Sequence, residues 1–284
     1  MTWPDEDAAR QVQMSLLPPS TLSLGSWEVA GRLVPMGECE CLFDYYPLGH
    51  GCCALSIAWF GGTAMTAASL MRDVHSLQRI HCNGSWATLE SMKRLNEHGL
   101  RALGKQEITM FYAEFDSKHR VLYYCSGGYG IPPLLRRRDD LPRWLIKGGG
   151  SSMLHSVQNV NFTEVQVSLG AGDSLLLYSH GLARALDPCG MGFEVERLDA
   201  ICQRCAGAAS SEVVAAIFEG VQSFRDHALL DSIEDLPGMI EMMQSPGRLR
   251  DVVPSRTEAW SLRKRCARRD DVALVFLGQP SVQE

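Results

Sequence analysis

Apolar positions recur at two different periods along the chain, and the changes of period separate strands from helices. Alternation of apolar and polar residues predicts a strand over 27–34, and two apolar runs on either side of a Gly-His-Gly turn predict a hairpin. Apolar spacings of three and four predict helices, the third of which should end at Gly99. The predicted strands are 27–34, 43–48, 52–59, 108–115, 120–125, 174–179 and 271–277, and the predicted helices are 5–17, 64–79, 85–99 and 210–224.

The order of these elements predicts the fold class. Hairpin-linked strands interleaved with pairs of helices are typical of an α+β protein in which helices cover mainly antiparallel sheets. The strand over 271–277 is apolar throughout, which predicts burial of both its faces. We expect an N-terminal amphipathic linker helix within residues 1–22 and one domain over 23–280, with a loop-rich insertion at about 226–262.

Composition and charge narrow the classes of partner. Apolar residues make up 45% of the chain and charged residues 21%, as in ordinary globular proteins. The net charge of −6 gives no general basic field for nucleic acid or anionic lipid. Two basic runs, at 136–138 and 263–269, are each followed by a pair of aspartates. We therefore expect these arginines to pair within the molecule, and we expect no nucleic-acid partner.

The cysteine content and the N-terminus predict a reducing, cytoplasmic setting. Ten cysteines in 284 residues are too few for a disulfide framework, and the first residues are acidic rather than an apolar leader. Residues 45–71 carry no charged side chain and are long enough to cross a membrane. Pro47 and several glycines interrupt this segment, so it predicts strands, turns and a helix, and we expect no membrane partner.

Five segments in order resemble the SpoIIE-like (RsbU-type) branch of the PPM metal-dependent serine/threonine phosphatases. They are ARQVQMSLLP at 9–18, FDYYPL at 43–48, YYCSGGYGIPPLL at 123–135, GDSLLLYSHGLARALDP at 172–188 and RDDVALVFL at 269–277. Each segment alone is a weak signal, but together they span most of the chain. The resemblance implies an α/β/β/α sandwich of two mainly antiparallel sheets flanked by helices, in agreement with the periodicity.

The resemblance also implies a metal centre, and at that centre the sequence departs from the family. Phosphatases of this type hold Mn or Mg with a cluster of aspartates, and the ions activate the water that attacks the phosphoester. At three of the four aspartate positions this chain has Cys41, Trp59 and His180. The fourth is retained as Asp270, next to Asp271, and Asp44 is a retained acidic neighbour in the first loop.

The replacements predict the loss of two-metal catalysis. A tryptophan cannot coordinate a cation, and the remaining carboxylates cannot offset the charge of two divalent ions. The first interpretation is therefore a pseudophosphatase that binds proteins and no metal cofactor. The alternative is an active phosphatase with a remodelled site, in which sulfur and imidazole ligands suit Zn better than Mg or Mn. Its candidate ligands are Glu38, Glu40, Cys41, Asp44, His180 and Asp270.

Partner contacts are expected by resemblance at the N-terminal helix. Partners in this family are typically anti-sigma-factor antagonists of the STAS type, and Arg10, Gln13, Leu16 and Leu17 are the candidate contact residues. The helix could instead serve as a homodimer interface or pack on its own domain. A separate zinc hypothesis at Cys202-Gln-Arg-Cys205 lacks the second cysteine pair that a structural site requires.

Overall fold

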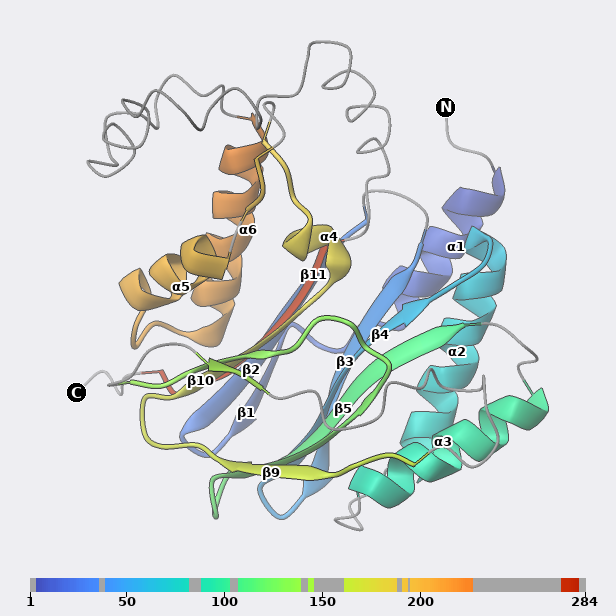
Figure 1. The fold of residues 1–284 in the computed structure, drawn as a ribbon, viewed down its shortest axis with the longest axis horizontal. Coiled ribbons are helices and arrows are strands. Elements are labelled where there is room, and N and C mark those ends of the chain that lie inside the picture. The colour runs from blue at the N-terminus through green and yellow to red at the C-terminus, as the bar shows by residue number, and fades with distance from the viewer. Residues whose placement is uncertain are drawn as a thin grey trace, which may run out of the picture.

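Two antiparallel sheets lie face to face, and helices cover the outer face of each (Figure 1). The structure is a computed structural model, and it describes residues 4–35, 39–81, 88–102, 107–138, 143–145, 161–187, 191–193, 195–226 and 272–280. Within these ranges, no helix has the length and apolar character needed to span a membrane. The predicted α+β class and the four-layer arrangement are confirmed.

The first sheet, sheet A, has six strands in the order β1-β2-β11-β10-β7-β8. Their bounds are Thr21–Leu24 for β1, Trp27–Val34 for β2, Val272–Gly278 for β11, Ser174–Tyr178 for β10, Leu134–Arg136 for β7 and Arg143–Trp144 for β8. β11 lies between β2 and β10, so the end of the chain completes the middle of a sheet begun near the N-terminus. This central place explains its continuous apolar sequence.

The second sheet, sheet B, has five strands in the order β3-β4-β5-β6-β9. Their bounds are Cys41–Gly49 for β3, Cys52–Phe60 for β4, Ile108–Asp116 for β5, Val121–Gly127 for β6 and Val165–Ser168 for β9. The predicted hairpin joins β3 to β4. Its turn places Gly49, His50 and Gly51 at positive φ, which is a conformation that glycine adopts readily.

Among the described residues, one group of helices covers sheet B and a second lies on the side of sheet A (Figure 1). The first group is α1 (Pro4–Ser15), α2 (Ala64–His81) and α3 (Thr88–Ala102), and the second is α4 (His180–Ala183), α5 (Val195–Arg204) and α6 (Ser210–Asp226). α1 packs beside α2. The prediction that α3 ends at Gly99 was wrong, because the helix continues to Ala102; a glycine inside a helix costs only about 1 kcal/mol.

The alternation of side chains along the strands builds three apolar layers. The layer between the sheets takes residues such as Phe43, Leu55 and Val275, and it is the central core. A second layer lies between sheet B and α1 to α3. A third lies between sheet A and the helices α5 and α6, where Phe276 of β11 is buried. β11 therefore buries both faces, as predicted.

Candidate functional site

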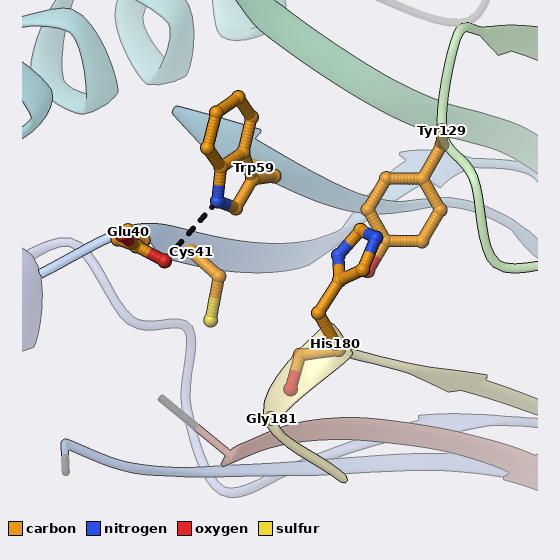
Figure 2. A pocket seen from close by; sticks show the side chains of 7 residues that line it. Glu40, Cys41, Trp59, Tyr129, His180 and Gly181 are labelled. Carbon is orange, nitrogen blue, oxygen red and sulfur yellow. Dashed lines mark hydrogen bonds between the residues drawn. The ribbon is translucent and has the colours of Figure 1, made fainter. Parts of the chain in front are cut away.

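A small pocket lies where the start of β3 and the end of β4 meet the junction of β10 and α4 (Figure 2). Its volume is about 10 Å³, close to the minimum that one water molecule needs. The residues that line it are Glu40, Cys41, Trp59, Tyr129, Ser179, His180 and Gly181. Three of these are the residues that the resemblance placed at metal-ligand positions, so the fold brings Cys41, Trp59 and His180 together.

On the side of sheet B, the pocket is lined by Cys41 and Trp59, which face each other on neighbouring strands, and by the acidic residue Glu40. Cys41 of β3 lies directly opposite Trp59 of β4. Glu40 precedes β3, where its carbonyl accepts a hydrogen bond from the Phe60 amide at 2.7 Å. The indole Nε1 of Trp59 donates to a carboxylate oxygen of Glu40 at 3.2 Å. A side chain on Gly61 would come within 3.1 Å of the Trp59 ring, so this glycine leaves room for the indole.

The opposite wall comes from β6, β10 and α4. His180 is the first residue of α4 and packs edge-on against the ring of Tyr129, with 5.9 Å between ring centroids. The Tyr129 hydroxyl donates to the carbonyl of Tyr178 at 2.9 Å. Burial raises the pKa of Tyr129 well above its ordinary value, and the neighbouring Cys41 and Tyr178 raise it further. The phenol therefore stays protonated and holds this loop onto β10 as a hydrogen-bond donor.

The residues of the pocket do not fit a pair of hard divalent cations. The described residues that line it supply one carboxylate, one thiol and one imidazole, whereas Mg and Mn prefer several carboxylate and other oxygen ligands. The carboxylate of Glu40 accepts from a neutral indole, and the indole occupies one side of the pocket. Across the described ranges, no three or more His, Cys, Asp or Glu side chains form a group able to hold a metal ion.

Asp44, predicted as a candidate metal ligand, does not line the pocket. It lies three residues after Cys41 on the same strand, so its side chain points to the opposite face of sheet B, toward α2. There it is 1% exposed and accepts two hydrogen bonds from the Arg79 guanidinium, at 2.8 and 3.1 Å. Burial raises the pKa of Asp44, while Arg79 and then His75 lower it.

Other candidate ligands lie outside the described residues. These are Glu38, Asp270 and Asp271. The role of the retained aspartate pair therefore stays a prediction. The second basic run at 263–269 and most of the insertion at 226–262 also lie outside these ranges.

The N-terminal helix is attached to the strand that lines the pocket. Gln13 is fully buried, and its side-chain amide donates to the carbonyl of Cys41 at 2.7 Å. Leu16 and Leu17 are half-buried against the apolar layer beneath α1 to α3. Arg10 is also half-buried. Of the four candidate contact residues, Gln13 thus contacts its own domain, and a partner could reach it only if α1 moved.

Two further sequence features have structural partners. In the first basic run, Arg136 pairs with Asp199 at 3.2 Å and Arg137 pairs with Asp173, as the sequence predicted. Cys202 of the C-x-x-C pair is buried in the layer next to sheet A, where burial raises the pKa of its thiol to about 12. A thiol held protonated in an apolar layer is a poor metal ligand.

Sequence reasoning missed Tyr129 and Ser179 as pocket residues. Both lie in segments that carried the family resemblance, directly after β6 and directly before His180. Their position next to motif residues was the available signal. They meet in the pocket because β6 of sheet B and β10 of sheet A come close together in the fold. The periodicity of the sequence does not predict which strands of two different sheets lie close together.

Solved structures with similar folds include the following three chains. The SiaA PP2C domain of Pseudomonas aeruginosa has a TM-score of 0.66 at 13% identity, covering 96% of this chain and 94% of that one. The RsbU and RsbW domains of a Mycobacterium tuberculosis protein have a TM-score of 0.60 at 18% identity, covering 90% of this chain and 62% of that one. The catalytic domain of the phosphatase PstP, solved with 2 manganese ions, has a TM-score of 0.55 at 14% identity. The match covers 89% of this chain and 97% of that one.

At these identities the structural likeness establishes the fold alone, and this chain spans less than two thirds of the Mycobacterium chain. No curated protein sequence matches. The sequence model of the family described as Stage II sporulation protein E matches residues 49–233, which is more than half of the chain. Together with the two-sheet fold, this match shows that the chain belongs to the SpoIIE family of PP2C-type phosphatase domains.

Proposed function

We propose that this chain is a pseudophosphatase, a SpoIIE-type domain that acts by binding proteins in a partner-switching or sigma-factor signalling pathway. The observation that carries the proposal is the indole of Trp59 in the position expected for a metal-ligating carboxylate. It is hydrogen-bonded to Glu40, whose carboxylate is the one that the described residues bring to the pocket. A pocket with this lining lacks the negative charge that two divalent ions require.

The proposed partner is a STAS-type anti-sigma-factor antagonist, bound at the face of the former active site. Support comes from the fold shared with a chain that contains RsbU and RsbW domains. The pocket face is favoured over α1 because Gln13 is buried against β3, and Leu16 and Leu17 pack against the domain. Homodimerisation through α1 is a further proposal by resemblance, and it requires the exposed side of this helix, where Met14 is 43% exposed.

We expect no phosphatase activity with Mn or Mg. Purified protein should release no phosphate above the protein-free blank from a phosphoserine peptide, and calorimetry with Mn should detect no binding, because the pocket lacks the carboxylates. The informative control is the triple variant C41D/W59D/H180D, which restores the family's ligand types and should gain Mn binding. Mn-dependent phosphate release by the native chain that is lost in His180→Ala would contradict the pseudophosphatase.

Binding should depend on the pocket face. Candidate STAS-domain proteins of the source organism, with and without phosphoserine, can be titrated against the chain by calorimetry. We expect a complex without dephosphorylation, weakened at least about tenfold by His180→Ala, because tenfold corresponds to one lost contact of about 1.4 kcal/mol. Met14→Glu on the exposed side of α1 is the matched control and should bind normally. Loss of binding in Met14→Glu alone would instead place the contact on the helix.

The second candidate is an active phosphatase with a remodelled zinc site. It is favoured by one observation, that Glu40, Cys41 and His180 line the same pocket, since thiolate and imidazole are preferred zinc ligands. In the described structure these three side chains do not form a metal-holding group, so zinc binding would require them to move closer together. Mass spectrometry of protein purified without chelators provides the test. Stoichiometric zinc that disappears in Cys41→Ser, together with zinc-dependent turnover of a phosphopeptide, would establish this candidate, and metal-free protein would remove it.

A further inference from the structure

A buried carboxyl group lies on the helix side of β5, a strand that α3 contacts. It is five residues along β5 from Thr109, the partner of the pocket residue Trp59. Glu114 of β5 is 1% exposed on the helix side of the sheet. One of its carboxyl oxygens accepts a hydrogen bond from the Tyr112 hydroxyl at 2.9 Å. The other oxygen is buried and has no hydrogen-bond partner among the described residues. A buried carboxylate left in this state costs several kcal/mol, so the group favours its neutral form.

The surroundings of Glu114 add negative rather than positive charge. Glu164 lies just before β9, and its carboxylate accepts a hydrogen bond from the backbone amide of Leu89 in the first turn of α3. Burial raises the pKa of Glu114, the Tyr112 hydrogen bond lowers it, and the charge of Glu164 raises it again. No described Lys or Arg side chain forms an ion pair with Glu114.

The groups near Glu114 include one further acid and several neutral side chains. Asp116 lies two residues along β5 on the same face; burial raises its pKa, but hydrogen bonds from His119 and Lys118 lower it overall. From β6, the buried thiol of Cys125 has a pKa raised to about 12, by burial first and then by Glu164 and Glu114. From β4, Cys52 also has a raised thiol pKa, to which burial contributes most and Glu114 least. From α3, Thr88 is buried with no partner for its hydroxyl among the described residues. The buried polar side chains Ser91 and Asn96 come from the same helix.

The charged residues of α3 lie on its exposed side. They are Glu90, Lys93, Arg94 and Glu97, and Arg94 pairs with Glu90 at 3.0 Å. In the described structure none of these side chains forms an ion pair with Glu114. β5 is held between β4 and β6, so it cannot carry Glu114 to solvent. α3 can move more easily, because it lies at the outside of the sandwich beside α2 (Figure 1).

We propose that Glu114 and α3 form a pH-responsive device, in which α3 is docked on sheet B while Glu114 is protonated and opens from the sheet when Glu114 ionises. The sign follows from proton linkage. The docked state binds one proton more than the open state over the range between the ordinary pKa of a glutamate and its raised value in the fold. Raising the pH through that range therefore favours opening, by up to about tenfold per pH unit for one proton.

Hydrogen exchange of the α3 amides tests the proposal. Protection of residues 92–96, corrected for the pH dependence of chemical exchange, should fall between pH 5 and pH 8 in the native chain, while α6 serves as an internal reference. In Glu114→Gln, which keeps an acceptor for Tyr112 but cannot ionise, protection of α3 should not change with pH. The matched control is Glu97→Gln on the exposed side of the same helix, which should behave as the native chain.

A second variant decides the outcome if Glu114→Gln does not fold. Glu164→Gln retains an acceptor for the Leu89 amide but removes the neighbouring charge that raises the pKa of Glu114 in the docked state. The fall in protection should therefore end at lower pH and be smaller in total. Equal pH dependence of α3 protection in the native chain and in Glu114→Gln, or no shift in Glu164→Gln, would overturn the device. Neither result bears on the pocket, where metal and partner binding are measured separately.

Discussion

Replacing Arg79 with leucine should destabilise the protein by about 3 kcal/mol, because the substitution leaves a carboxylate buried without its charge partner. Asp44 is 1% exposed, whereas the Arg79 side chain is 40% exposed, which places the cost at the lower end of the range for buried pairs. The guanidinium also lies over the Tyr46 ring, 4.1 Å from its centroid, so its removal loses packing as well. Urea unfolding at neutral pH measures the loss.

The pH dependence of the lost stability distinguishes the effect of the unpaired Asp44 charge from the effect of lost packing on Tyr46. Burial raises the pKa of Asp44 and Arg79 opposes that shift, so Arg79→Leu should raise the pKa further. A folded-state pKa above the unfolded value makes the penalty largest at neutral pH and smaller as the pH falls and Asp44 becomes protonated. His75 lies 3.6 Å from Asp44, and its pKa is lowered by burial first and then by Arg79, while Asp44 raises it.

Two comparisons make the Arg79 result decisive. Arg72→Leu, on the same helix with a side chain 65% exposed, should change stability by no more than about 0.5 kcal/mol. The double variant D44L/R79L should lose less than R79L alone, because no unpaired charge remains. Equal losses in R72L and R79L would show that the Asp44 pair contributes nothing to the attachment of α2.

The second large effect is expected at Gly31, where Gly31→Ala should cost about 3 kcal/mol. A Cβ atom here would lie 2.5 Å from the Phe43 ring and 2.9 Å from the Tyr45 ring. Both rings are buried between the two sheets, and the Tyr45 hydroxyl donates to the Pro19 carbonyl, so neither ring can withdraw easily. The extra methyl group must therefore push the sheets apart or force the rings off their rotamers.

Gly25→Ala is the matched control for Gly31→Ala. Gly25 has a φ of +65° and open space around its Cβ position, so its substitution tests backbone strain without a clash and should cost about 1 kcal/mol. Combining Gly31→Ala with Phe43→Leu should recover part of the loss by removing one ring. A Gly31→Ala variant no less stable than Gly25→Ala in urea unfolding would mean that the sheet interface is not closely packed at this point.

The elements of the fold could be predicted from periodicity because each one buries a continuous face. β2 was predicted with its observed bounds, and the strands on either side of the Gly49–Gly51 turn were predicted within one or two residues. The end of α3 was not, because Gly99 is a weak stop signal that packing overrides. The pairing of β11 with β2 was also outside the reach of periodicity, since it joins residues more than 200 positions apart.

In the candidate site, too, some residues could be predicted from the sequence and others could not. Cys41 and His180 could be predicted, because they take the places of ligands in motifs that the sequence displays. Asp44 was misplaced because a residue type near a motif does not fix which face of a strand it occupies. Asp44 lies three positions after Cys41 on β3, so the two side chains point to opposite faces of sheet B. This could not be inferred from the sequence, because the predicted strand began at residue 43, two residues after the observed start at Cys41.

The sequence by itself determined the class of fold and the family likeness, since both depend on residue type and spacing along one chain. The tertiary structure decided which side chains meet. It placed the Trp59 indole against Glu40, Asp44 beneath α2 and Glu114 beside Tyr112 on the helix side of sheet B. The physical reason is that the register between strands and the packing of layers arise from long-range contacts, whose partners are not encoded in any local pattern.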